Sequence, residues 1–321
     1  MLRAGEKAMI AYILRRMLVS VPILLVVLTL VFLLVRIAPG DPAVAALGDY
    51  ASQEAVERMR QRMGLNKPLW MQYVDFLGQL ARGDLGRSLI NDVPVSQQIR
   101  RVLPYTLELT GSGIFVGLLF GIPLGIVTAL RRNTLLDYAG RIFGLAGLSV
   151  PAFYLGILLM LLFAVELDLF PVVGGGELSD LRDNLHHLFL PALSLGLIMT
   201  AYITRMARSA MLEVLNADYM RTARAKGLQE RVVLIRHGLR TALIPVVSVV
   251  GVYSIVLIGS SVMTEVVFSR PGVGKLMVGA MKQRDYTTLQ SIMVIYASFV
   301  VIINLITDIA YGLIDPRIRY E

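Results

Sequence analysis

The chain has 321 residues, of which 56% are hydrophobic and 17% are charged, and its formal net charge is +8. This composition is too apolar and too poor in charge for an ordinary soluble domain, so it excludes most soluble enzymes and indicates a membrane protein. Cysteine is absent, which excludes disulfides, thiolate metal sites and a cysteine nucleophile in this chain.

Six stretches are long and apolar enough to cross a hydrocarbon core of ~30 Å, which takes about 20 helical residues. We therefore predict an all-α membrane protein with about six transmembrane helices. The predicted spans are 17–35, 107–130, 142–165, 188–203, 243–263 and 289–313.

The first span could instead belong to a cleaved signal peptide. Arg15 and Arg16 precede its apolar run, and Ala43-Val44-Ala45 resembles a cleavage site. The run is longer than the ~7–15 residues of a signal peptide's apolar core. We therefore predict an uncleaved transmembrane helix within an N-terminal segment, residues 1–36.

The positive net charge could indicate either nucleic-acid binding or contact with a lipid bilayer. The placement of the basic residues along the chain distinguishes the two. Arg131, Arg132 and the basic stretch 205–240 fall on one side of the predicted spans, and short loops on the other side carry few Lys or Arg residues. Cytoplasmic loops carry such an excess. We therefore predict a lipid bilayer rather than nucleic acid as the partner, with both termini cytoplasmic.

Residues 37–102 form a polar segment between the first two spans, which we predict to be an extracytoplasmic helical layer. Amphipathic helices are expected over 52–63, with Ser52 as N-cap, and over 69–80. A solvated linker is the alternative. Three aromatic side chains that require packing partners favour the layer, namely Trp70, Tyr73 and Phe76.

The remaining residues, 103–321, are predicted to form a membrane core of five helices. Glycines recur at four-residue spacing in its first helix, which predicts close packing on another helix rather than on lipid. Pro123 and Pro151 are expected to kink their helices. The spaced glycines are Gly113, Gly117, Gly121 and Gly125.

The basic connector 205–242 follows the fourth span. A short helix is expected to begin with Asn216 or Asp218 as N-cap and to end at Gly227, followed by a second helix over 229–239. The residues alone leave two interpretations open. The connector could dock in a groove of another protein, or it could rest on anionic lipid headgroups.

Several motifs resemble those of permeases from the dipeptide, oligopeptide and nickel class of ABC importers. The resemblance extends over nearly the whole chain and depends on the motifs in combination. They are Ala38-Pro39-Gly40-Asp41-Pro42, Gly83-Asp84-Leu85-Gly86-Arg87-Ser88, the run from Asp218 to Gly227, Ala242-Leu243-Ile244-Pro245, Arg284-Asp285-Tyr286 and Asp315-Pro316-Arg317-Ile318-Arg319.

This resemblance implies a permease subunit of a bacterial-type inner membrane that carries peptides or a related small solute. The implied partners are a homologous second permease subunit, two cytoplasmic ATPase subunits and an extracytoplasmic solute-binding protein. ATP and Mg would bind in the ATPase subunits, so no cofactor and no catalytic residue is expected in this chain. The alternative is a secondary transporter or channel without an ATPase.

By the same resemblance, the connector contains the coupling helix that seats in the ATPase. The implied coupling residues are Asp218, Tyr219, Arg221, Thr222, Ala223 and Gly227. The chain departs from the broader importer pattern, because Arg221-Thr222 stand where Glu-Ala would be and His237-Gly238-Leu239-Arg240 where Ile-x-Leu-Pro would be. We therefore expect a shape fit around Ala223 and Gly227 rather than a specific charge contact.

Three further features are candidates for a site. Gly272-Val273-Gly274-Lys275 lacks the leading glycine and the following Ser or Thr of a phosphate loop. His186 and His187 are adjacent on a helix and cannot readily chelate one ion. Ionisable groups at membrane depth are candidates for function, and Glu265, Asp308 and Glu108 are such groups near span ends. Each could instead cap a helix end or pair with a nearby Arg. The candidate pathway lining is Glu265 with Ser260 and Ser261.

Overall fold

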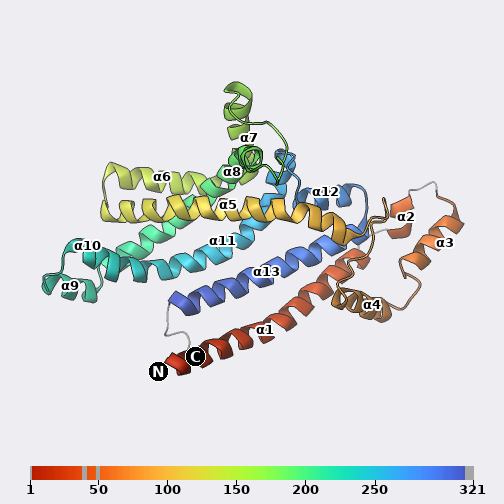
Figure 1. Cartoon of the computed structure of the whole chain (residues 1–321), viewed down its shortest axis with the longest axis horizontal. Helices are drawn as coiled ribbons and strands as arrows, with labels where there is room; N and C mark the ends of the chain where they lie inside the picture. Colours follow the sequence, from red (N-terminus) through yellow and green to blue (C-terminus); the bar gives the residue numbers. More distant parts are fainter. Residues whose placement is uncertain (1, 38–41, 48–50, 315–321) are drawn as a thin grey trace. The chain divides into compact units, whose positions relative to one another are not determined.

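The computed structural model describes residues 2–37, 42–47 and 51–314, and their regular elements are helices (Figure 1). Parts of two motifs, 38–41 and 315–319, lie outside the described residues. The elements are α1 (Leu2–Ile37), α2 (Pro42–Leu47), α3 (Gln53–Arg62), α4 (Leu69–Ala81), α5 (Val95–Leu130), α6 (Leu135–Ser149), α7 (Ala152–Met160), the π-helix η1 (Leu161–Glu166), α8 (Leu181–Leu215), α9 (Asp218–Ala225), α10 (Glu230–Val232), the π-helix η2 (Val233–Leu239), α11 (Arg240–Val267), α12 (Val273–Lys282) and α13 (Tyr286–Ile314).

Five of the described helical segments are individually long and apolar enough to cross a membrane. They lie in α1, α5, α8, the continuous segment from α10 to α11, and α13. A sixth crossing requires α6 to pair with α7 and η1 across a bend of 103°. Pro151 stands at this bend, where it lacks an N–H and disfavours helical backbone at Val150, so the expected kink is a full interruption. The prediction of about six spans is confirmed.

The chain divides into two compact units. Unit 1 is built mainly from Tyr105–Arg270, and unit 2 from Met17–Pro104 and Pro271–Ile302.

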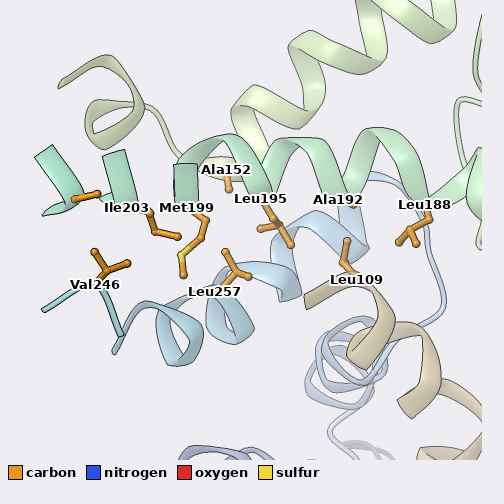
Figure 2. Close-up of a cluster of buried hydrophobic side chains, with 10 residues drawn as sticks. Leu109, Ala152, Leu188, Ala192, Leu195, Met199, Ile203, Val246 and Leu257 are labelled. Atoms are coloured by element: carbon orange, nitrogen blue, oxygen red, sulfur yellow. The ribbon is translucent and has the colours of Figure 1, made fainter. Parts of the chain in front are cut away.

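The core of unit 1 is organised around α8. Its buried apolar side chains recur every three or four residues, which places them on one helical face. Figure 2 shows this face turned toward side chains of α5, α7 and α11. The cluster comprises Leu188, Ala192, Leu195, Met199, Ile203 and Ala207 of α8 with Leu109, Ala152, Val246 and Leu257.

The spaced glycines of α5 allow this helix to approach α8 closely. A Cβ added at Gly117 would lie 2.3 Å from Met199 Cγ, and one at Gly125 would lie 2.8 Å from the carbonyl oxygen of Thr204. No real side chain fits such distances without displacing the neighbouring helix. The predicted packing on protein is therefore confirmed, and it holds α5 in place beside the helix that leads to the connector.

In unit 2, the two amphipathic helices predicted for the polar segment are present as α3 and α4. Ser52 caps α3 by accepting a hydrogen bond of 3.3 Å from the amide of Ala55, as expected. Tyr73 and Phe76 of α4 pack against Phe32 of α1, with ring centroids 5.2 and 5.6 Å apart. Of the three aromatic residues expected to pack, Tyr73 and Phe76 therefore hold α4 on α1, whereas Trp70 is 66% exposed and α3 buries none of its residues.

Candidate functional site

Two long helical segments enter the connector, since α8 continues as far as Leu215 and α10 begins at Glu230. The predicted N-cap of α9 is wrong. Asn216 instead ends α8 and donates its side-chain amide to the carbonyl of Leu212, and Ala217 is the N-cap. Gly227 follows the helix end with φ +76°, the left-handed conformation for which glycine was expected.

One face of α9 is buried against unit 1. Met220 is 0% exposed and Ala223 is 7% exposed. They belong to a group that we call the connector cluster, which gathers side chains from α5, α8, α9, η2 and α11. Its buried members are Ala129, Ala210, Met211, Val214, Met220, Ala223, Val233 and Ala242. Ala223, expected on the docking surface, therefore faces inward and fixes α9 to the helices that cross the membrane.

The opposite face of α9 is exposed. The side chains of Asp218 and Arg221 are 97% and 74% exposed and lie 3.7 Å apart, and Tyr219 and Thr222 are also exposed. The only large apolar group among these four is Tyr219, a residue type that commonly anchors protein interfaces. The expected coupling residues thus separate into an outward set, available to a partner, and the inward Ala223.

An ion pair closes the turn after α9. Arg224 donates from Nη2 to Glu230 Oε1 at 2.9 Å and from Nε to Oε2 at 3.1 Å. This hydrogen bond raises the pKa of Arg224 above its usual value. Sequence reasoning did not identify Glu230, because the pair spans a turn at Gly227 whose geometry brings the two side chains together.

The helix predicted over 229–239 is not separate from the fifth span. Instead α10, η2 and α11 run without a break, with the π-helical segment joining the connector to the membrane. Gly238 lies inside η2, and a Cβ there would lie 3.3 Å from both Met211 Cε and Met220 Cε. The flexible ends of both methionines thus pack against Gly238, and π-helical segments are often found at functional positions.

A buried ion pair lies at the same end of unit 1. Asp137 of α6 is 0% exposed and accepts bidentate hydrogen bonds from Arg208 of α8 at 2.6 and 2.9 Å. It also accepts from the amide of Asn133 at 3.0 Å. Sequence reasoning missed this pair, which joins residues 71 positions apart.

The predicted pathway residues are enclosed within unit 1. Glu265 is buried and accepts a hydrogen bond of 2.6 Å from Thr106 Oγ1 of α5. Ser261 is buried and donates to the carbonyl of Ile258 at 2.8 Å, and Ser260 is partly buried. Glu265 thus links α11 to α5, and Ser261 makes its hydrogen bond within α11.

A second polar group lies near the start of α8, and its central residue, Arg270, was not singled out from the sequence. Arg270 is fully buried and donates from Nη2 to Glu108 Oε2 at 2.7 Å and to Asn184 Oδ1 at 3.2 Å. Its Nη1 donates to the carbonyl of Gly175 at 2.9 Å. Because burying a lone charge is costly, this pairing explains why Glu108 is tolerated at the beginning of a span.

The other sequence candidates do not converge on a site. His186 Nε2 lies 2.9 Å from the carbonyl oxygen of Leu169, and His187 Nδ1 lies 2.9 Å from that of Asp183. Gly272 precedes α12 as its N-cap. Within the described ranges, no three His, Asp or Glu side chains are grouped as a metal site would require.

Comparison with known families identifies the chain. Residues 121–320 match the family described as "Binding-protein-dependent transport system inner membrane component", and residues 9–110 match "Binding-prot-dependent transport system membrane comp, N-term". The chain belongs to this family. Members of this family are transmembrane permease components and not ATPases, and they hold no cofactor of their own.

Individual relatives align with this permease along almost its entire length. It is 42% identical to the glutathione transport system permease protein GsiC of Pectobacterium atrosepticum over 313 residues, covering 98% of the chain and 100% of GsiC. It is 42% identical to the oligopeptide transport system permease protein AppB of Bacillus subtilis, covering 97% and 100%. It is 38% identical to the dipeptide transport system permease protein DppB of Alkalihalophilus pseudofirmus, covering 97% and 100%.

The fold of this permease is also similar to that of a solved transporter. The MetNI methionine ABC transporter, in inward-facing conformations, matches with a TM-score of 0.54 and 20% identity, covering 68% of this chain and 97% of that chain. At this identity the match shows the fold alone. Together, the matches confirm the predicted ABC-importer permease of a multi-pass inner membrane type, whose family implies ATPase and binding-protein partners.

Proposed function

We propose that this permease imports a peptide, or a peptide-like solute such as glutathione, through a pathway shared with a homologous second permease subunit. Its relatives named for glutathione, oligopeptide and dipeptide transport support this solute class. Two cytoplasmic ATPase subunits and an extracytoplasmic solute-binding protein complete the importer.

The two-sided character of α9 carries the proposal. Its buried face is part of the connector cluster, and its other face presents Tyr219 and Arg221 to a partner. A helix resting on lipid would turn its apolar face to the headgroups, whereas here that face is occupied by unit 1. Docking of an ATPase is therefore the better interpretation of the connector.

Coupling follows from the way in which α9 is held. The cluster joins α9 to the ends of α5, α8 and α11, so a displacement of α9 by the closing ATPase dimer moves these helices with it. Close-packed elements transmit such rigid-body shifts between discrete arrangements. The pathway would alternate between inward and outward access in this way.

We assign the connector end of unit 1 to the cytoplasm, and with it both termini. Ala129 of α5 lies in the connector cluster, so the basic turn with Arg131 and Arg132 lies at the same end as the basic connector. A membrane-impermeant maleimide tests this in intact spheroplasts. It should label Arg182→Cys but not Arg132→Cys, and the reverse pattern would contradict the orientation.

We also propose that Ser260, Ser261 and Glu265 lie beside the pathway, with Glu265 positioning α11 through Thr106. Glu265→Gln keeps an acceptor for Thr106 but removes the charge. Solute uptake by the whole importer should fall in this variant, and unchanged uptake would leave Glu265 with a purely structural role.

Isolation of the tagged chain from its native membranes tests the assembly. The preparation should contain a second permease and a nucleotide-binding ATPase. If the chain purified without any ATPase and transported peptide down a gradient after reconstitution, the secondary-transporter alternative would replace this proposal.

A further inference from the structure

Unit 2 contains a cavity of about 420 Å³ between the end of α1, the turn from α3 to α4, and the start of α13. This volume falls within the roughly 300–1,000 Å³ typical of small-molecule sites. Four of its lining side chains are cationic: Arg36, Arg62, Lys67 and Arg87. The cavity is therefore suited to an anion by charge and to a small solute by size.

Arg36 is the group that needs such an anion. Its Nε donates to Gln72 Oε1 at 3.1 Å, its Nη1 donates to Gln290 Oε1 at 3.0 Å, and its guanidinium lies 4.1 Å from the centre of the Phe32 ring. All three partners are neutral. In the part of the chain that the structure describes, no carboxylate pairs with Arg36 and no hydrogen bond uses its Nη2.

Gln290 supplies a second unused donor. The residue lines the cavity, is 9% exposed, and its buried Nε2 has no hydrogen-bond partner among the described residues. A buried amide donor without a partner is costly, as is a partly buried guanidinium without a counter-charge. The two residues contact each other through the hydrogen bond from Arg36 Nη1 to Gln290 Oε1. A single carboxylate, with its two acceptor oxygens, would accept from Arg36 Nη2 and from Gln290 Nε2 together.

The other lining cations leave the positive charge at the cavity in excess. Lys67 Nζ lies 2.6 Å from Asp75, and Arg62 and Arg87 share Asp92. Among the described residues, two carboxylates thus pair with three of the four cations, and neither of them pairs with Arg36. Asp75 and Asp92 therefore do not serve as its counter-charge.

We propose that this cavity is a binding site for the carboxylate of a small solute, held by Arg36 Nη2 and Gln290 Nε2. The rim cations draw the anion in, and the partial burial of Arg36 strengthens the contact because the local dielectric is low. The same chemistry could come from an acidic side chain of a docked protein, which the test below distinguishes. The site is independent of the coupling assigned to α9.

The test uses the purified full-length chain in lipid nanodiscs, without ATP, ATPase or binding protein. N-acetyl-trialanine and its C-terminal amide differ in the carboxylate alone and are titrated by calorimetry. The acid should bind saturably and at least about tenfold more tightly than the amide. Equal binding of both peptides, or no binding of either, would overturn the proposal.

Two variants and one control locate the site. Arg36→Gln removes the charge, and Gln290→Glu places a carboxylate of the chain's own beside Arg36 without loss of volume. Each should weaken binding of the acid about tenfold or more, whereas Arg58→Gln, an exposed charge on α3 outside the cavity lining, should not. Unchanged binding in a folded Gln290→Glu chain would overturn the assignment.

If the carboxylate comes from an acidic side chain of a docked protein, the binding measurements should give a different result. In that case the free peptide would not bind the nanodisc-embedded chain, while Arg36→Gln would weaken docking of the binding protein to the assembled importer. That result would also overturn the solute site.

Discussion

Arg208 Nε lies 2.6 Å from Asp137 Oδ1, and Arg208 Nη2 lies 2.9 Å from Asp137 Oδ2. The pair ties α6 to α8 two residues before Ala210, a member of the connector cluster. It therefore fixes a second helix to the element that supports α9.

Removal of the carboxylate should be strongly destabilising. Asp137→Ala leaves Arg208, which is mostly buried, without its counter-charge, and breaking a buried pair in this way costs about 3–5 kcal/mol. Equilibrium unfolding in mixed micelles measures the change. Arg141→Gln is the matched control, because Arg141 contacts the same carboxylate at 3.4 Å from an exposed position. A loss below about 1 kcal/mol for Asp137→Ala would mean that the pair is dispensable.

The glycine contact between α5 and α8 predicts a difference between two identical substitutions. Gly125→Ala forces a Cβ to within 2.8 Å of the Thr204 carbonyl oxygen and 3.0 Å of the Arg208 amide nitrogen, both of them backbone atoms. We expect a loss of about 1–3 kcal/mol in the free energy of unfolding. Gly111→Ala on the same helix meets nothing within 4 Å, so it should be neutral or stabilise the chain by up to about 1 kcal/mol through the higher helix propensity of alanine. Equal stability of the two variants would contradict the close approach.

We expect glycine to be required at position 227 because of its left-handed backbone conformation and not because a side chain would clash there. A Cβ there meets nothing within 4 Å, but φ is +76°. Gly227→Val should cost about 1–2 kcal/mol, whereas Gly227→Asn, which tolerates this conformation, should cost less. Hydrogen exchange of 218–226 should therefore speed up about 5- to 30-fold in the valine variant alone. The same exchange rates in both variants would argue against the left-handed turn.

Two substitutions on opposite faces of α9 should have different effects on ATP hydrolysis and on hydrogen exchange of α9. Ala223→Glu buries a carboxylate in the apolar connector cluster, so it should release α9 and abolish solute-stimulated ATP hydrolysis. Arg221→Glu changes an exposed side chain, so it should lower stimulation while hydrogen exchange of α9 stays as in the native chain. If Ala223→Glu left both exchange and stimulation unchanged, the inward placement of Ala223 would be wrong.

Periodicity and composition were sufficient to predict most of the helices. Ser52 as a cap, α4 and the glycine face of α5 are local patterns, and local patterns are visible in a sequence. The interruption at Pro151 was expected only as a kink, because the 103° bend depends on what the two halves pack against.

The site was predictable only in part. The resemblance identified the run that forms α9, but it could not say that Ala223 faces inward, since that depends on the direction of a short helix against α8 and η2. The pairs Arg208–Asp137 and Arg224–Glu230 join residues brought together by the fold. Helical spacing gives no signal for such contacts, and the continuity of α10, η2 and α11 was hidden by the polar residues of η2.

The outward face of α9 is proposed to contact an ATPase. Because the chain has no native cysteine, a single introduced cysteine reports one position. In the assembled importer, Arg221→Cys carrying a short photo-crosslinker should form an adduct with the ATPase subunit, and Arg182→Cys near the start of α8 should not. An adduct from Arg182→Cys alone, or crosslinks from Arg221→Cys to lipid only, would contradict docking of the ATPase on the outward face of α9.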